Sequence, residues 1–113
     1  VIQGLAQALF EEAVHDGDGN LKNGSLIEYL VPAASEVPSL TLGHTVTPSP
    51  TNQLGVKGIG EAGTIGAAPA VINAVVDALS HLGVRDMPMP ASPNTVWAAI
   101  QSAIGPASQG ASK

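Results

Sequence analysis

The chain contains no cysteine, and this absence removes several kinds of chemistry from consideration. Disulfide bonds, iron–sulfur ligation and thiolate catalysis all need a cysteine sulfur, so none of them can occur within these 113 residues. The absence alone leaves the redox compartment of the protein undecided.

Charged residues are also few, at 12 % of the sequence, and basic residues are the rarer kind. The four basic and nine acidic residues give a net charge of −5, without the cationic stripe that binds nucleic acid or anionic membranes. A hydrophobic fraction of 44 % is high beside so little charge, since soluble domains typically carry about a quarter charged residues. Some of the surface is therefore expected to be covered by a partner.

Long apolar runs are missing as well. No run approaches the roughly 20 residues of a membrane span, and no signal peptide begins at Val1, so a soluble, cytoplasmic protein without a membrane span is expected. The chain begins with Val1 rather than methionine, and a helical pattern starts almost at once, at Gln3. We interpret it as one domain at most, excised from a larger protein.

Glycine, in contrast, is concentrated in one stretch. Residues 54–67, LGVKGIGEAGTIGA, hold five of the thirteen glycines and a single acid, Glu61. Glycine at this density costs chain entropy and is typical of backbone that takes positive φ or lies very close to another group. A flexible loop with a solvated glutamate is the simpler interpretation. A site built around the carboxylate is the alternative.

Residues 68–83, which follow this stretch, have the pattern of a helix. One face is apolar, with the spacing of a 3.6-residue period: Val71, Val75, Ala78, Leu79 and Leu82. Pro69 suits the first turn of such a helix, and Gly83 suits the position after the last turn. The glycine-rich loop therefore leads into a helix N-terminus, where free N–H groups can hold an anion, either a ligand's phosphate or Glu61 itself.

Residues 58–63 also match the G-x-G-x-x-G pattern of dinucleotide-binding folds. That fingerprint requires a buried strand before the first glycine and an acid about 20 residues later, at the end of a second strand. The preceding residues are too rich in proline and polar side chains for a central strand, and Asp77 lies inside the predicted helix. We do not expect a dinucleotide site.

Two further helices are predicted at the two ends of the chain. Apolar residues at helical spacing cover residues 3–14, with polar residues elsewhere on the wheel. Ser92 and Pro93 form an N-cap and first-turn pair that opens a last helix, which Gly105-Pro106 ends.

The remaining segments predict short strands. Apolar and β-branched runs favour strands at residues 26–31 and 39–47, and residues 84–89 are expected to be extended. The expected fold class is α+β, with about three helices packed on a few short strands. The tail, residues 106–113, has no apolar content to bury and is expected to be disordered.

No spacing of possible ligands supports a metal site. His15, His44 and His81 are too far apart in the chain for a local zinc motif. Residues 15–20, HDGDGN, resemble a calcium loop only faintly, because the other oxygen ligands and the closing glutamate of an EF-hand are missing. Glu61 is the one residue whose setting suggests chemistry.

Several stretches together resemble a known family. They are GVKGIGEAG at residues 55–63, with HTVTPSPTN before it, IQGLAQAL at 2–9, residues 24–32, and VRDMPMPASPNTVWAAI at 84–100. These stretches resemble the C-terminal end of the molybdopterin-binding large subunit of the molybdenum hydroxylases, the family of xanthine dehydrogenase and aldehyde oxidase. Within the family they look most like the aerobic carbon monoxide dehydrogenase type. The resemblance continues to about Ile104.

The resemblance implies roles for five residues. In that family the glutamate of the glycine-rich stretch lies beside the molybdenum and acts as a base, and this residue is Glu61 here. A glutamine in the first helix contacts the pterin of the cofactor, which corresponds to Gln3. The glycine loop comes close to the metal site, and this implicates Lys57, Gly58 and Gly60 in cofactor binding. The implied cofactor is molybdopterin, in its cytosine dinucleotide form.

Departures from the family pattern are small. Gln53 stands where proline is common, and Ala67-Ala68 replace a pair that is often Ser-Pro or Pro-Pro. Neither change involves Glu61. The family also implies partners, namely the remainder of the molybdenum-binding subunit and the domains or subunits that carry iron–sulfur clusters and FAD.

Two hypotheses about function remain. In the first, residues 1–105 are the C-terminal part of a molybdopterin-binding domain, in an oxidoreductase that is active only as a larger assembly. In the second, the chain is an accessory or binding domain that kept the fold and lost catalysis. The substrate, whether carbon monoxide, an aldehyde, a purine or another N-heterocycle, is not identified, because the family's substrate-contacting loop lies outside these residues.

Overall fold

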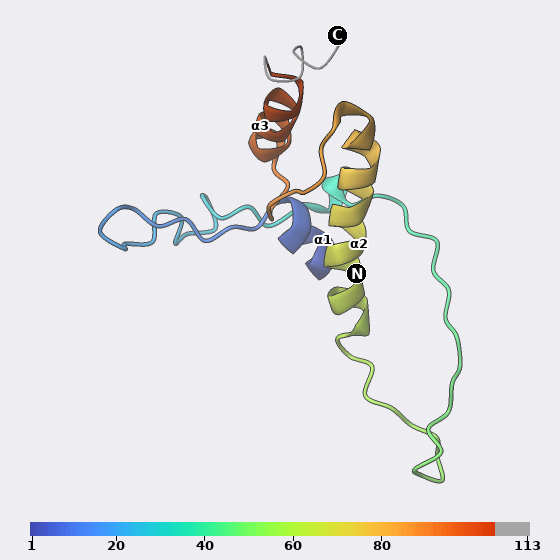
Figure 1. Ribbon diagram of the computed structural model, residues 1–113. Helices are drawn as coiled ribbons and strands as arrows, with labels where there is room; N and C mark the ends of the chain where they lie inside the picture. The colour runs from blue at the N-terminus through green and yellow to red at the C-terminus, as the bar shows by residue number, and fades with distance from the viewer. Residues whose placement is uncertain (106–113) are drawn as a thin grey trace.

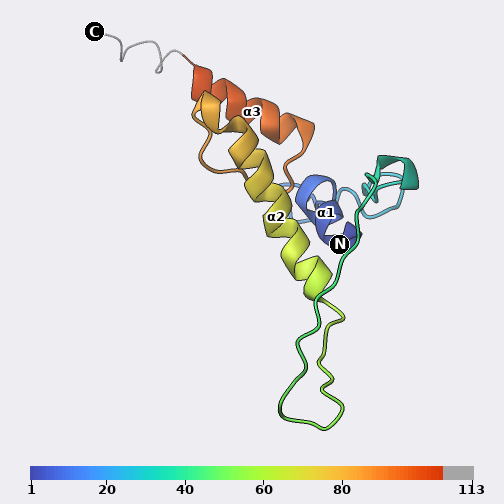
Figure 2. The ribbon, with the colours of Figure 1, turned by 90° about the vertical axis from the view of Figure 1, so that its right-hand side faces the viewer.

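The computed structural model describes residues 1–105 and builds them around one long helix. This helix, α2 (Ala62–Leu79), has α1 (Ile2–Leu9) beside its N-terminal half and α3 (Pro93–Ile104) beside its C-terminal half (Figures 1 and 2). Two short 3-10 helices complete the regular structure, η1 (Ala34–Glu36) and η2 (Ser80–Leu82).

Helices α1 and α2 run in the same direction and touch at a glycine. Gly4 is buried, and a Cβ at this position would lie 2.5 Å from the carbonyl oxygen of Thr64 and 2.9 Å from the Cβ of Ala67. A Cβ on Gly63 would lie 3.1 Å from the backbone nitrogen of Val1. The two helices therefore begin side by side, and only glycine permits this approach at Gly4.

A small apolar core lies where the other end of α2 meets α3. Its buried members come from the link between α2 and α3 and are Val84, Met87 and Ala91. The partly buried residues around them come from all three helices and include Leu9, Ile72, Val75, Val76, Leu79 and Val96. The backbone N–H of Ala91 donates to the carbonyl of Ala8 at 2.7 Å, which fixes the link against the end of α1.

Two long segments leave this helical body (Figure 1). We call residues 10–33 the hairpin arm and residues 37–61 the glycine arm. The radius of gyration is 19.2 Å, whereas a compact chain of this length would have about 13 Å. Apolar side chains on both arms are exposed, including Leu26 at 84 % and Leu54 at 85 %.

The three predicted helices are confirmed, but the strands of the α+β prediction are not, because residues 1–105 contain no strand beyond one isolated bridge between His15 and Leu21. The predicted strand at 26–31 folds into turns, in which the N–H groups of Glu28 and Tyr29 donate to the carbonyl of Ser25. The predicted segments 39–47 and 84–89 are irregular because no neighbouring backbone pairs with them.

Helix boundaries were predicted with mixed success. The helix at 93–104 is confirmed, and Ser92 caps it by accepting a hydrogen bond from the N–H of Thr95 at 3.2 Å. Gly83 was predicted to follow the last helical turn, and it does so after η2 with φ 92°, a left-handed conformation that favours glycine. The second helix begins earlier than predicted, so Pro69 lies inside it rather than in its first turn, and packing of α1 on residues 63–68 accounts for this extension.

The first helix is shorter than predicted and ends at Leu9 rather than at residue 14. The side chain of Asn23 accepts the N–H of Val14 at 2.9 Å, and its amide donates to the carbonyl of Glu12. These contacts draw residues 12–14 into the base of the hairpin arm. The predicted disorder of the tail concerns residues 106–113, which lie outside the described residues.

The helical stretch Ala62–Leu82 is 21 residues long with a mean hydropathy of 1.5, so one helix does reach the length and apolarity of a membrane span. The prediction that no such stretch exists was wrong in this respect, because glycine and alanine make the stretch apolar without an obvious hydrophobic run. Length and composition are weak grounds for a span, since core helices meet the same criteria. Here α2 packs against α1 at Gly4 and shares the apolar core around Val84 with α3, but most of the helix is exposed.

The close approach of α1 and α2 predicts opposite effects for two glycine-to-alanine changes in the 113-residue chain. Gly4→Ala should destabilise the fold by about 1–3 kcal/mol, because its methyl group must displace the backbone of α2. Gly66→Ala, in α2 but with open space around it, should leave stability unchanged or raise it by up to about 1 kcal/mol. Thermal unfolding followed by circular dichroism measures both. Equal effects would contradict this packing.

A second prediction concerns Tyr29, the single tyrosine of the chain. Its hydroxyl donates to Oε2 of Glu11 at 3.0 Å, and this hydrogen bond raises the pKa of Tyr29 above 10.0. The folded chain thus holds the phenolic proton more tightly, so the contact stabilises the fold below the ordinary tyrosine pKa and is lost as pH rises through the raised value.

Absorbance titration of tyrosinate should therefore show a high midpoint that Glu11→Gln lowers toward the ordinary value. Glu12→Gln is the matched control, since no described contact links Glu12 to Tyr29, and it should leave the midpoint unchanged. A normal midpoint in the unaltered chain would mean that the hairpin arm does not fold back onto the end of α1.

Candidate functional site

The far end of the glycine arm is a closed loop, residues 48–56, which we call the tip loop. The N–H of Ser49 donates to the carbonyl of Gly55 at 2.9 Å, and the N–H of Gly55 donates to the carbonyl of Asn52 at 3.1 Å. Gly55 has φ +65°, and a Cβ there would lie 2.8 Å from the Cβ of Pro48. The conformation and the contact both require glycine at this position.

The side chain of Asn52 closes the tip loop a second time. Its Nδ2 donates to the carbonyl of Val56 at 3.0 Å, and its Oδ1 accepts the N–H of Val56 at 3.1 Å. One side chain thus pairs with both backbone groups of a residue four positions later. The sequence analysis did not single out Asn52, although an asparagine in a segment rich in proline and serine is a signal for this kind of turn.

Beyond the tip loop the arm returns toward α2 through residues 57–61 (Figure 2). Lys57 is exposed, and its Nζ donates to Oγ1 of Thr47 at 3.1 Å, which ties the two sides of the arm together. A Cβ on Gly58 or Gly60 would meet nothing within 4 Å, and neither glycine has positive φ. No contact among the described residues explains these two glycines, so their bare backbone is available to a neighbour from outside the chain.

Glu61 is the last residue before α2 and is exposed. Its backbone carbonyl accepts the N–H of Ile65 at 2.9 Å, but its carboxylate makes no capping hydrogen bond and has no partner within residues 1–105. The interpretation that Glu61 satisfies the N–H groups of its own helix is therefore wrong. The carboxylate is free to bind something else.

Gln3 lies in the first turn of α1, is exposed, and makes no side-chain hydrogen bond within residues 1–105. Because Gly4 contacts Thr64 and Val1 contacts Gly63, this turn lies beside the start of α2. The structure therefore brings Gln3 and Glu61 to the same end of the helix pair. It does not gather Lys57 there, since this side chain is held along the arm by Thr47.

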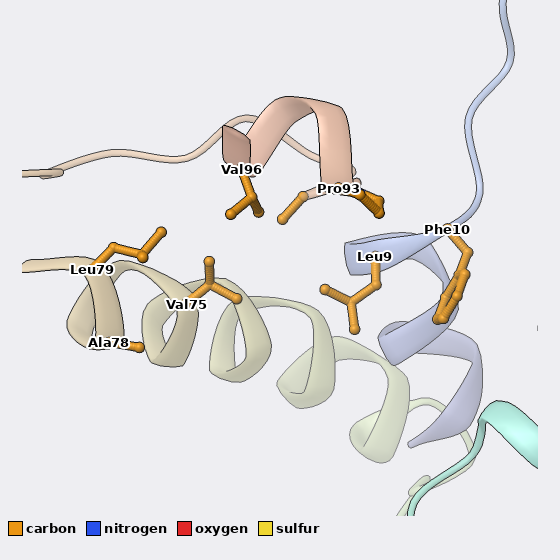
Figure 3. A pocket seen from close by; sticks show the side chains of 8 residues that line it. Leu9, Phe10, Val75, Ala78, Leu79, Pro93 and Val96 are labelled. Carbon is orange, nitrogen blue, oxygen red and sulfur yellow. The ribbon is translucent and has the colours of Figure 1, made fainter. Parts of the chain in front are cut away.

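An apolar groove lies at the other end of α1, between α2 and α3, and is separate from these residues (Figure 3). Its volume is 450 Å³, and its lining comes from all three helices: Leu9, Phe10, Val75, Ala78, Leu79, Ala91, Pro93 and Val96. No side chain in the lining can donate a proton, accept one or bind a metal. The groove is a packing surface and offers no chemistry.

The residues at the start of the helix pair fit one wall of a site for a polar cofactor. Glu61 supplies a carboxylate and Gln3 an amide, neither with a side-chain hydrogen bond within residues 1–105, and Gly58 and Gly60 supply backbone without side chains. All four residues are exposed. Two parallel helix N-termini add the positive ends of their dipoles to the same region. No opposing wall is present within residues 1–105, so the remaining contacts to a cofactor must come from other parts of a larger protein.

Comparison with known proteins shows what the chain is similar to. The family of the molybdopterin cofactor-binding domain matches residues 1–38. The carbon monoxide dehydrogenase large chain of Hydrogenophaga pseudoflava is 38 % identical over 99 residues, which are 88 % of this chain and 12 % of that protein. The nicotine 6-hydroxylase large subunit of Paenarthrobacter nicotinovorans is 41 % identical over 104 residues, 92 % of this chain and 13 % of that protein.

The fold agrees with the same relationship. The crystal structure of the Cu,Mo-CO dehydrogenase in its carbon monoxide reduced state superposes with a TM-score of 0.81 at 31 % identity, over 90 % of this chain and 14 % of that one. The chain thus spans about an eighth of the length of the curated relatives it matches. By sequence and by fold, it belongs to the family of the molybdopterin-binding large subunits of the molybdenum hydroxylases.

Proposed function

We propose that residues 1–105 form the C-terminal part of the molybdopterin-binding domain in a molybdenum-dependent dehydrogenase or hydroxylase, and that Glu61 is its catalytic base. The free, exposed carboxylate of Glu61 carries this proposal, together with the open backbone of Gly58 and Gly60 beside it. If Glu61 only capped α2, its carboxylate oxygens would accept hydrogen bonds from the first N–H groups of the helix.

Glu61 acts in the proposed reaction by accepting a proton. The molybdenum cofactor, when bound, accepts two electrons from the substrate and supplies the oxygen that is transferred. One carboxylate oxygen of Glu61 would take one of the two protons that are released when the substrate is oxidised and water replaces the transferred oxygen, and would give it up to solvent afterwards; the second proton would leave to solvent directly. Because Glu61 directly precedes α2, its backbone is fixed at one end and the short side chain needs little reorganisation.

The other four residues would hold the cofactor. The amide of Gln3 can donate to and accept from the pterin, and the bare backbone of Gly58 and Gly60 allows the cofactor to approach closely. Lys57 would contribute through its backbone or after leaving Thr47, since its ammonium group is bound there now. We propose the cytosine dinucleotide form of the cofactor on the basis of the family resemblance.

The proposed enzyme is an assembly. Since the chain has no cysteine, the iron–sulfur clusters that carry electrons away must be bound elsewhere, and we propose that they and FAD lie on partner subunits in the cytoplasm. The substrate is a small molecule, to be sought among carbon monoxide, an aldehyde, a purine and an N-heterocycle. The apolar groove would be covered by the remainder of the molybdenum-binding subunit.

Replacing Glu61 tests the proposal. In the assembled enzyme, Glu61→Gln should lower kcat by at least about 10²–10⁴ on the best substrate of that panel, because glutamine keeps size and hydrogen bonding but cannot take the proton. Molybdenum content, measured by plasma mass spectrometry, should remain near that of the unaltered enzyme, since the carboxylate is not needed for the fold.

Glu12→Gln is the matched control, because Glu12 is equally exposed but lies at the base of the hairpin arm, and it should retain full kcat. A Glu61→Gln enzyme with full molybdenum content and near-normal kcat would overturn the proposed role. An unaltered assembly that contains this chain but no molybdenum would instead support the accessory-domain hypothesis.

A further inference from the structure

The tip loop has a construction that the proposed chemistry does not by itself explain. Asn52 pairs with the N–H and the carbonyl of Val56 at 3.1 and 3.0 Å, in the manner of a neighbouring strand. This pairing fixes the direction in which the chain leaves the tip loop. The residues that leave it are the ones that lead to Glu61.

Between the tip loop and α2 the return segment has little support of its own. Its described hydrogen bonds are those from Lys57 Nζ to Thr47 at 3.1 Å and from the N–H of Ala62 to the carbonyl of Ile59 at 3.3 Å, and at its end the carbonyl of Glu61 accepts the N–H of Ile65 at 2.9 Å. Two glycines within the segment make it still more adaptable. The backbone path of the return segment therefore depends on how its two ends are held, by α2 at one end and by Asn52 at the other.

We propose that Asn52 is a positioning residue for Glu61, which acts by holding the return segment in the path that presents the carboxylate. This inference rests on the proposed role of Glu61 as the base. Asparagine suits the task because its amide donates and accepts at once. Aspartate at this position could still accept the N–H of Val56, but it would set a negative oxygen against the Val56 carbonyl.

The functional test uses variants of the assembled enzyme. Asn52→Ala should lower kcat about 10- to 100-fold per bound molybdenum, as expected for a misplaced catalytic group, while KM changes little. Asn52→Asp should give a value between those of Asn52→Ala and the unaltered enzyme. The double variant Asn52→Ala/Glu61→Gln should be no slower than Glu61→Gln alone in single-turnover reduction by substrate, because Asn52 acts only through Glu61.

Thr51→Val is the matched control. It removes the contact of 2.8 Å between the hydroxyls of Ser49 and Thr51 in the same tip loop, but leaves the Asn52–Val56 pair in place, so kcat should be unchanged. Loss of kcat in Thr51→Val equal to that in Asn52→Ala would mean that any disturbance of the tip loop suffices, and would overturn the specific role of Asn52.

Hydrogen exchange gives a readout that does not depend on turnover. The N–H of Val56 should exchange faster in Asn52→Ala than in the unaltered enzyme and in Thr51→Val, with faster exchange extending toward Glu61. Three results would each overturn the inference. The first is unchanged exchange and kcat in Asn52→Ala, and the second is a loss of activity in this variant that lost molybdenum explains wholly. The third is a double variant that is slower than Glu61→Gln. Full activity of Glu61→Gln itself would instead refute the proposed base, and Asn52 would have nothing to position.

Discussion

The close packing of α1 on α2 at Gly4 is the contact on which the rest of the arrangement depends. A glycine there lets the two backbones approach so closely that both helices begin at the same end of the pair. This brings the exposed side chain of Gln3, one residue before Gly4, to the region of Glu61, which directly precedes α2. Neither residue is held by any contact of its own side chain within residues 1–105, so their proximity follows from the helix packing alone.

The chain divides its surface into parts with different physical character. The polar, glycine-rich end has open backbone and side chains without hydrogen-bond partners, whereas the groove at the other end of α1 is lined by apolar residues. The two arms expose further leucine and isoleucine side chains, such as Ile27 at 95 %. Exposed apolar area of this extent is typical of surfaces that bind a partner. The polar end suits a small polar ligand instead.

The sequence predicted those features that depend on neighbouring residues. Ser92 and Pro93 mark the start of α3 because capping is a local interaction, and the density of glycine marks the stretch around Glu61 on which the proposed site rests. Strand pairing depends on a distant partner, so the apolar run at 26–31 was mistaken for a strand. Asn52 was not predicted for a related reason, since its proposed role rests on the bonds to Val56 and not on its residue type.

In the proposed enzyme, the Glu61 end of the helix pair forms one wall of the molybdenum site. Crystals of the intact enzyme allow the most direct test, because anomalous scattering locates the molybdenum independently of any assignment of residues. We expect the metal to lie beside the carboxylate of Glu61, with the pterin on the side of Gln3 and the backbone of Gly58 and Gly60 against the cofactor. A molybdenum atom located elsewhere, with Glu61 left in solvent, would contradict the proposal.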